Sequence, residues 1–440
     1  MRIKTAINFL LTAALCAGAY AAEGPVPNGI SDLDHVFVIM MENHGYSQIV
    51  NNPNAPFINT LVNSANSATN YFAVGHPSLT NYLEVVGGSN FGIRSDDYPN
   101  WHNSSCTPNL ASGTTLLDNP AGTPALVCPI EGSGTDAATP AQDCTNEVQA
   151  PPCLWDIDGV KSIDAAPNTI GKTIADQLAE HGRRWKSYQQ SLPASGADNV
   201  NYSDGFFTNT TNFSTFLANG TFASWGVQGV TVPAATTQSQ AQSDIVLLYA
   251  AKHNPFAYFR SVQEGKYSFD SLSNIAGFDG PGGLYQDLGS GNVPDFSFIA
   301  PNQCNDQHGR SNAGPFCNFD ESDNGTQSGL NQALILQGDN TVQQIVTAIK
   351  SSPVWERGNN AIVILWDEND YTATLNQALL IVDSNQGENH VSSSRSYNHF
   401  SLLKTLEAGF DLPCLNHACD SDVNVMSDLF PSAPSFPFFR

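Results

Sequence analysis

The sequence predicts an α/β protein: an α/β/α sandwich in which helices cover both faces of a mostly parallel central sheet. Two observations support this fold class. Segments with the apolar spacing of strands and segments with that of amphipathic helices alternate along the chain. The strand segments are continuously apolar, as in His35–Met41 (HVFVIMM), which is typical of strands buried on both faces. Such strands belong to parallel sheets with helices on each side.

The predicted strands are runs of apolar, mostly β-branched residues. The first, His35–Met41, leads directly into a polar Glu-Asn-His sequence. The later strands are expected at Arg184–Gln189, Phe296–Ala300, Ala361–Trp366 and Ala378–Val382.

The predicted helices carry apolar residues at i, i+3, i+4 and i+7. Ser78–Val86 has this spacing, and Gly87-Gly88 ends it. A later helix is expected to be capped by Asp339, because Val342, Ile345, Val346 and Ile349 follow at helical positions. The other helices are expected at Thr169–Glu180, Ser243–Ala251 and Phe400–Ala408.

Two polar stretches interrupt the alternation. Residues 89–165 are rich in Asn, Pro, Gly and Cys, and residues 191–240 in Asn, Thr, Ser and Gly. We interpret both as insertions on the rim of the sheet, where they would shape a substrate pocket. No internal repeat or linker divides the chain, so residues 22–440 are expected to form one domain with these insertions.

The N-terminus has the pattern of a secretory signal peptide over residues 1–21. Arg2 and Lys4 precede an apolar run from Ala6 to Ala14, and Ala19-Tyr20-Ala21 resembles a cleavage site. The run is too short to span a membrane, and no other stretch approaches the length of a transmembrane helix. We therefore expect a secreted or periplasmic protein.

The chain is strongly acidic. Its formal net charge is −24, and loss of Arg2 and Lys4 with the signal peptide would make it −26. Such a surface repels nucleic acids and anionic membranes, so neither is an expected partner. A small anionic substrate remains compatible with this charge, provided that a local cation attracts it.

Eight cysteines remain after the signal peptide, and in an exported protein they are expected to form disulfides. Cys414 and Cys419 can close a small loop, and Cys304 and Cys317 are a second plausible pair. The other four would then stabilise the first insertion: Cys106, Cys128, Cys144 and Cys153.

Ser78 is the candidate nucleophile. It follows His76-Pro77 and begins a predicted helix, where free N–H groups and the helix dipole favour an anion or an incipient alkoxide. Asn81 lies three residues on, on the same face, and could hold a second oxygen of that anion. An ordinary serine N-cap has the same local sequence, so the catalytic interpretation depends on the rest of the chain.

Acidic residues follow two of the predicted strands. Glu42 and Asn43 come after the first strand, and Gly45 is expected to permit the turn that brings them together. Asp367 and Glu368 come after another strand, at the edge where open α/β sheets bind ligands. Buried carboxylates need a cation. We expect one divalent ion, Mg²⁺, Ca²⁺, Mn²⁺ or Zn²⁺.

Three histidines, His253, His308 and His399, lie in loops that this sheet would bring to the same edge. They are candidate general acids. His308 is two residues from Asp306, whose carboxylate could orient it, and His399 could return to the edge through a short strand. We rank these two equally, ahead of His253. His253 and His76 are better explained as binding phosphate oxygens or supporting the loops, and His76 ranks last as an acid.

In seven segments the chain resembles the phosphoesterases that include acid phosphatases and bacterial non-specific phospholipases C. They are MMENHGY (40–46), NYFAVGHPSLTNYLEVVGG (70–88), WKSYQQSLP (185–193), KHNPFAYF (252–259), PNQCNDQH (301–308), LWDEND (365–370) and YNHFSLLKTLE (397–407). The resemblance implies an alkaline-phosphatase-like sandwich in which Ser78 is the nucleophile and Asn81 contacts the phosphoryl group. It also implies that Glu42, Asn43, Asp367 and Glu368 hold the metal, with Ser78 completing its shell.

The expected function is hydrolysis of a small phosphate ester by an acid phosphatase through a phosphoserine intermediate. A phospholipase C-type phosphodiesterase is the alternative, but that branch is longer and often has a twin-arginine signal. A non-catalytic exported binding protein would be expected to lack residues at the nucleophile or metal positions, and here each position is filled.

Overall fold

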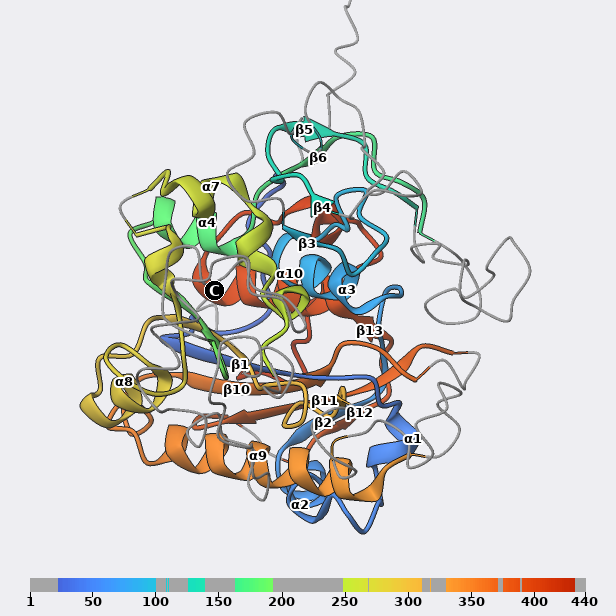
Figure 1. The fold of residues 1–440 in the computed structure, drawn as a ribbon, viewed down its shortest axis with the longest axis vertical. Coiled ribbons are helices and arrows are strands. Elements are labelled where there is room, and N and C mark those ends of the chain that lie inside the picture. The colour runs from blue at the N-terminus through green and yellow to red at the C-terminus, as the bar shows by residue number, and fades with distance from the viewer. Residues whose placement is uncertain are drawn as a thin grey trace, which may run out of the picture.

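The computed structural model describes residues 23–99, 108, 110, 126–138, 163–192, 248–267, 269–310, 317, 330–370, 375–387 and 390–431. These residues form a nine-stranded sheet in the order β12-β2-β11-β10-β1-β9-β7-β8, with β13 also paired to β2. Helices lie on both faces of the sheet (Figure 1). The predicted α/β/α sandwich is therefore confirmed.

The strands that build the main sheet are β1 (His35–Met41), β2 (Asn66–Phe72), β7 (Trp185–Gln189), β8 (Ile275–Ala276), β9 (Phe296–Ala300), β10 (Asn360–Trp366), β11 (Gln377–Ser384), β12 (Ser392–Ser393) and β13 (Tyr397–Asn398). Two small ladders lie outside it, formed by β3 (Tyr98–Pro99) with β4 (Leu126–Val127) and by β5 (Ser133–Gly134) with β6 (Thr169–Ile170).

The described α-helices are α1 (Tyr46–Ile49), α2 (Pro56–Ser64), α3 (Ser78–Gly87), α4 (Ile174–Glu180), α7 (Arg260–Glu264), α8 (Leu284–Ser290), α9 (Gln332–Lys350) and α10 (His399–Phe410). Short 3₁₀ helices occur at η4 (Ala251–His253), η5 (Pro255–Tyr258), η6 (Leu272–Asn274) and η9 (Asn416–Cys419).

The sheet is mixed but mostly parallel. β1 lies at its centre and pairs in parallel with β10 and β9, and β7 pairs in parallel with β9 and β8. β11 runs antiparallel to both β10 and β2. All seven residues of β10 are buried, as a strand covered on both faces requires.

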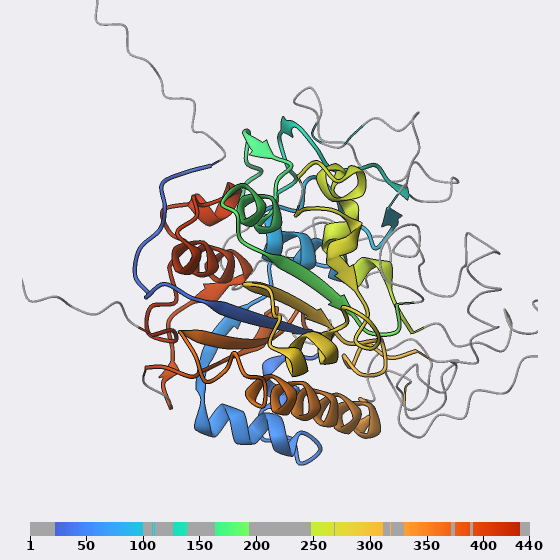
Figure 2. The same cartoon turned by 90° about the vertical axis from the view of Figure 1, so that its left-hand side faces the viewer.

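Two helical layers cover the sheet. On one side α2 packs against α9, and α8 also contacts α9. On the other side α3, α4 and α10 contact one another. The view turned by 90° shows the same two layers on either side of the strands (Figure 2). Ser78 therefore lies at the start of a helix that is packed between the sheet and its neighbouring helices.

Most predicted elements are present with small differences in length. β1 and β9 have the predicted bounds, and β7, β10 and β11 differ by one or two residues at their ends. The helix predicted at residues 169–180 begins later, because Thr169–Ile170 form β6 and Thr173 caps α4. The Thr173 hydroxyl accepts from the backbone of Ala175 and Asp176, which fixes the start of that helix.

The prediction that Asp339 caps its own helix is wrong. α9 begins at Gln332, where the Asn331 side chain accepts from the backbone N–H of Ala333. Asp339 is buried in the middle of α9. Its carboxylate accepts from the backbone N–H groups of Phe57 (3.1 Å) and Ile58 (2.7 Å). Asp339 therefore caps α2, across the helix–helix contact.

Several expectations lie wholly or partly outside the described residues. These are the signal peptide, nearly all of the second insertion, much of the first, and residues 243–247 of the predicted helix Ser243–Ala251. Residues 248–250 are not helical, and Ala251 begins η4.

Both expected disulfides between described cysteines, Cys304–Cys317 and Cys414–Cys419, are present. Cys128 is also disulfide-bonded. Cys106, Cys144 and Cys153 are outside the described residues, so the stabilised insertion stays a prediction. Within the described ranges, no helix is both long enough and apolar enough to cross a bilayer.

Candidate active site

The polar residues after β1 and β10 meet at one edge of the sheet. Glu42 and Asp367 are the first residues beyond these two strands, and both are fully buried. The backbone N–H of Asp367 donates to the Met41 carbonyl (2.9 Å), and that of Glu42 donates to the Asp306 carbonyl (2.8 Å). The loops after β1, β10 and β9 are thus joined directly beneath the site.

The turn that follows Glu42 is made by Asn43 rather than by Gly45. Asn43 has a φ of +51°, a left-handed conformation that asparagine tolerates better than most residues. Gly45 has a φ of −67° and is the N-cap residue of α1. The turn lets the Asn43 backbone N–H donate to Asp367 Oδ1 at 3.0 Å, which joins the two predicted pairs of ligands.

Ser78 is the first residue of α3 and is almost completely buried. Its hydroxyl lies 3.2 Å from Glu42 Oε2 and 3.4 Å from Glu368 Oε1. The next backbone N–H, that of Leu79, donates to Asp96 Oδ1 at 3.0 Å. The nucleophile predicted from sequence therefore lies between two predicted metal ligands, and a carboxylate that was not predicted occupies part of the helix N-terminus.

The Asn81 side chain is engaged by four protein partners. Its oxygen accepts from the backbone N–H groups of Val74 (3.1 Å) and Gly75 (3.0 Å). Its nitrogen donates to the Gly75 carbonyl (2.9 Å) and to Glu368 Oε2 (3.0 Å). These bonds use both amide hydrogens. Here the side chain ties the loop before α3 to Glu368, and its expected contact with a phosphoryl oxygen stays a prediction.

The cluster of buried carboxylates is electrostatically unfavourable by itself. Burial, and then the neighbouring Asp367 and Asp306, raise the pKa of Glu42 well above its usual range. Burial, and then Glu368, raise the pKa of Asp367 in the same way. A shared cation would relieve this repulsion.

The predicted ligand set fits such a cation. No hydrogen bond between described residues reaches the buried atoms Asn43 Oδ1 and Asp367 Oδ2. Carboxylate, amide and hydroxyl oxygens are the donors that hard divalent ions prefer. The five residues predicted as ligands lie together: Glu42, Asn43, Ser78, Asp367 and Glu368.

His253 lies between two carboxylates. Its Nε2 is 3.1 Å from Glu42 Oε1, and its Nδ1 is 3.1 Å from Asp306 Oδ2. The ring stacks on Tyr82 of α3 with 5.2 Å between centroids and 7° between planes. Burial, and then the positive charge of Lys252, lower the pKa of His253 well below its usual value.

His308 is held as a neutral imidazole. Its Nδ1–H donates to the Gly309 carbonyl at 2.9 Å, so Nε2 accepts from Lys252 Nζ, also at 2.9 Å. Burial, and then Lys252, lower the pKa of His308 to about 3. The expectation that Asp306 orients this ring is wrong, because that carboxylate accepts from the His308 backbone N–H and pairs with the His253 ring.

His399 reaches the same edge, as expected, but faces the backbone. Its Nε2 lies 2.7 Å from the Asp367 carbonyl oxygen, which can only accept. Nδ1 therefore accepts from the Tyr71 hydroxyl at 2.7 Å. Burial lowers the pKa of His399 to about 4. His76 Nδ1 contacts Glu368 Oε2 at 2.9 Å, which supports that carboxylate.

A sequence profile of the Phosphoesterase family matches residues 48–317, which is more than half of the chain. The chain belongs to the Phosphoesterase family. The matched region contains Ser78, Asn81, His253 and His308, whereas Glu42, Asn43, Asp367 and Glu368 lie outside it.

Curated relatives of this phosphoesterase are phosphatases. The chain is 20% identical over 399 residues to a probable acid phosphatase of Kluyveromyces lactis, covering 89% of this chain and 61% of that protein. It is 34% identical over 110 residues to phosphatidylinositol-3-phosphatase of Mycobacterium tuberculosis, covering 24% of this chain and 36% of that protein. The chain thus spans only part of the length of the curated relatives that it matches.

Solved structures are more distant. A protein of the alkaline phosphatase superfamily from Vibrio parahaemolyticus aligns with a TM-score of 0.41 and 12% identity, covering 89% of this chain and 69% of that one. The phosphonate monoester hydrolase of Agrobacterium radiobacter aligns with a TM-score of 0.42 and 10% identity, covering 92% and 79%.

The sequence did not predict the observed contacts of three residues at this site: Lys252, Asp306 and Asp96. The one local feature that could have indicated a role for Lys252 is its position directly before His253. Asp306 was expected beside the wrong histidine. Asp96 belongs to a polar insertion in which nothing local distinguishes it from neighbouring turn residues.

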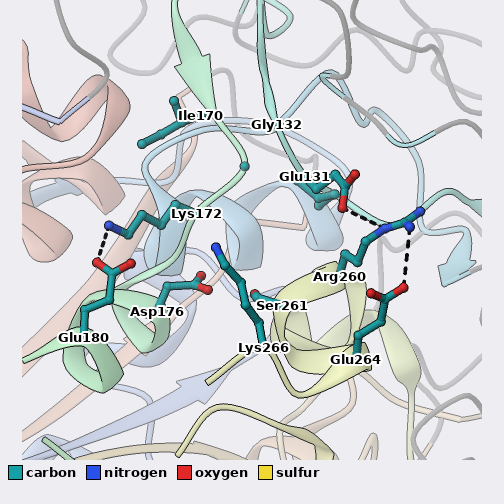
Figure 3. Close-up of a pocket in the computed structure, with 12 residues that line it drawn as sticks. Glu131, Gly132, Ile170, Lys172, Asp176, Glu180, Arg260, Ser261, Glu264 and Lys266 are labelled. Atoms are coloured by element: carbon teal, nitrogen blue, oxygen red, sulfur yellow. Dashed lines mark hydrogen bonds and ion pairs between the residues drawn. The ribbon is translucent and has the colours of Figure 1, made fainter. Parts of the chain in front are cut away.

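A cavity of about 560 Å³ lies elsewhere, lined by residues of α4, α7 and the β5–β6 region (Figure 3). Lys172 pairs there with Glu180 at 2.6 Å, and Arg260 Nε pairs with Glu131 at 2.8 Å. Its cations are thus matched by acidic neighbours, and neither Ser78 nor its carboxylate partners line it. We place the active site at Ser78 instead.

Proposed function

We propose that this protein is a metal-dependent phosphoric ester hydrolase that prefers monoesters and acts through a phosphoserine intermediate on Ser78. One observation carries the proposal: the Ser78 hydroxyl lies at the start of α3, between the carboxylates of Glu42 and Glu368. A serine used only as a helix cap does not require two buried acids within 3.4 Å of its hydroxyl. The acid phosphatases among the relatives support the monoester preference.

In the proposed reaction Ser78 Oγ attacks phosphorus and the bond to the ester oxygen breaks. The serine proton moves to an adjacent carboxylate oxygen, Glu42 Oε2 or Glu368 Oε1. The leaving alkoxide, on the side of phosphorus opposite Ser78, is protonated by a histidine. Water then attacks the phosphoserine and releases inorganic phosphate, which regenerates the hydroxyl.

Glu42, Asn43, Ser78, Asp367 and Glu368 would hold one divalent cation. When bound, the cation would supply Lewis-acid stabilisation of the serine alkoxide and of a phosphoryl oxygen. Asn81 and His76 contribute by holding Glu368, which they contact at 3.0 and 2.9 Å. These two residues position a ligand in this proposal.

Among the histidines, we propose His308 as the group that protonates the leaving oxygen. In the free protein its Nε2 accepts from Lys252, so the ring must take up a proton from solvent before Nε2 can donate one. His308 is partly exposed, whereas His253 and His399 are buried. A substrate can reach a partly exposed ring. His253 and His399 would then orient Glu42 and Asp367.

The protein is further proposed to be secreted or periplasmic. The signal-peptide pattern at residues 1–21 and the disulfides Cys304–Cys317 and Cys414–Cys419 support this location. Disulfides persist in oxidising compartments, where a small phosphate ester would be the accessible substrate.

The test is the Ser78→Ala variant, assayed with p-nitrophenyl phosphate and bis-p-nitrophenyl phosphate. We expect a loss of at least about 1,000-fold in kcat for the monoester, because the attacking oxygen is absent. Acid quenching of the wild type with a ³²P-labelled monoester should trap label on Ser78. Ser89→Ala, which removes a buried hydroxyl at the other end of α3, is the matched control and should keep its activity. Substantial turnover by Ser78→Ala would contradict the mechanism, and faster diester hydrolysis by the wild type would contradict the preference.

A further inference from the structure

Lys252 is a mostly buried lysine that is linked through Asp96 to the start of α3. Its side chain is 10% exposed, and its ammonium group pairs with Asp96 Oδ2 at 2.7 Å. The other oxygen of Asp96 accepts from the backbone N–H of Leu79, the residue after Ser78. One carboxylate therefore links the ammonium group to the first turn of α3.

Glu42, His253 and His308 form a group in which one ligand atom from each lies within 4.8 Å of the others. A carboxylate and two imidazoles at such spacing resemble a set of zinc ligands. Glu42 belongs to this group and also to the predicted oxygen-rich ligand set. The site thus has donors suited to a second cation beside the first.

The Lys252 ammonium group competes for this second set of donors. It donates to His308 Nε2 at 2.9 Å, and the Nδ1–H of the same ring is used by the Gly309 carbonyl. A metal ion would need the lone pair that Lys252 now engages. Burial and neighbouring carboxylates raise the pKa of Glu42 and Asp367, and the charge of Lys252 offsets part of this increase.

We propose that the ammonium group of Lys252 takes the place of a second metal ion and binds a phosphoryl oxygen of the substrate. This inference rests on the proposed function and deepens it. A phosphate monoester dianion has one more charged oxygen than a diester, so a fixed cation beside the first ion favours monoesters. It also supplies the local positive charge that this acidic chain needs to attract an anion.

The first test counts metal ions. Wild-type protein and the Lys252→Met and Lys252→Arg variants are stripped with chelator, dialysed against Zn²⁺ or Mn²⁺, and analysed for bound metal by mass spectrometry. We expect one ion per chain in the wild type and in Lys252→Arg, which keeps the charge. In Lys252→Met the released His308 nitrogen should allow a second Zn²⁺ to bind. Two tightly bound ions in the wild type, or one in Lys252→Met, would overturn the proposal.

The second test measures inorganic phosphate binding by calorimetry at one bound metal ion per chain. We expect Lys252→Met to weaken binding about 10- to 100-fold, the loss of one charge-assisted hydrogen bond, and Lys252→Arg to restore most of it. Lys172→Met is the matched control, because Lys172 is also ion-paired but lies outside the site, and it should bind phosphate as the wild type does. Unchanged affinity in Lys252→Met would overturn the proposal.

Thermal unfolding shows whether each variant is folded, and Lys252→Gln replaces Lys252→Met if the latter is not. Wild-type ester hydrolysis separates the two hypotheses. If the wild type hydrolyses monoesters and Lys252→Met binds phosphate normally, only the role of Lys252 fails. If the wild type is inactive but Lys252→Met shows both changes, the role of Lys252 stands as a binding function and the proposed reaction fails.

Discussion

The Tyr71–His399–Asp367 chain of hydrogen bonds explains how a buried histidine can matter without donating a proton. The Tyr71 hydroxyl donates to His399 Nδ1, which leaves Nε2–H to hold the Asp367 carbonyl. All three side chains are fully buried. A lost bond here leaves a buried polar atom unsatisfied, which typically costs about 1–3 kcal/mol.

Tyr71→Phe should therefore lower the free energy of unfolding by about 1–3 kcal/mol in urea denaturation. Turnover should fall equally for p-nitrophenyl phosphate and an alkyl phosphate, because the bond positions Asp367 rather than protonating the leaving group. His308→Ala should instead lose far more on the alkyl phosphate. Tyr285→Phe, at a side chain on the surface, is the control for losing a hydroxyl. A loss in Tyr71→Phe that depends on the leaving group would return His399 to the role of acid.

At the residue scale, the sequence placed side chains correctly at one edge of the sheet where position in the chain alone determines their place. Glu42 and Asp367 directly follow adjacent parallel strands, and strand ends meet at one edge of a sheet. Asp96 contacts Leu79, 17 residues away in the sequence, and Lys252, 156 residues away. Asp306 pairs with His253, which lies in another loop. No spacing in the sequence indicates such pairings, so they required the fold.

At the scale of elements, the contact between α2 and α9 depends on a capping group that crosses from one helix to the other. α2 begins with Ala55 as its N-cap, and alanine offers no side-chain acceptor. Asp339, from the middle of α9, accepts from the backbone N–H groups of Phe57 and Ile58 instead. The start of α2 is thus stabilised by tertiary contact, which explains why the sequence around it did not predict this helix.

Asp339→Ala should lower the free energy of unfolding by about 1–2 kcal/mol, the usual effect of removing a helix cap. Asp339→Asn keeps one acceptor oxygen and should lose less, which makes it the matched control. Urea denaturation measures both, and hydrogen exchange should be faster at the amides of both Phe57 and Ile58 in Asp339→Ala but at only one of them in Asp339→Asn. Equal stability of the alanine variant and the wild type would show that water caps α2 just as well.

At the scale of the whole molecule, a buried carboxyl pair far from Ser78 should make stability depend on pH. Asp270 is fully buried and lies beside Asp176 of α4. Burial, and then the charge of Asp176, raise the pKa of Asp270 to about 8, and Lys266 lowers it only in part. Burial and the neighbouring negative charge both disfavour the ionised form, so folding favours protonated Asp270.

In the unfolded chain the pKa of Asp270 should be about 3.9. Between about pH 4 and pH 8 the folded state therefore binds more protons than the unfolded state, and stability falls as the pH rises. The slope from this group is at most about 1.4 kcal/mol per pH unit. Asp270→Asn is neutral at every pH, and its amide can donate to Asp176. The free energy of unfolding of the variant minus that of the wild type, measured in urea, should therefore increase from pH 4 to pH 8. The other titrating groups are common to both proteins, so their contributions cancel in this difference. If the difference in free energy of unfolding stayed constant from pH 4 to pH 8, Asp270 would be ionised in the folded protein.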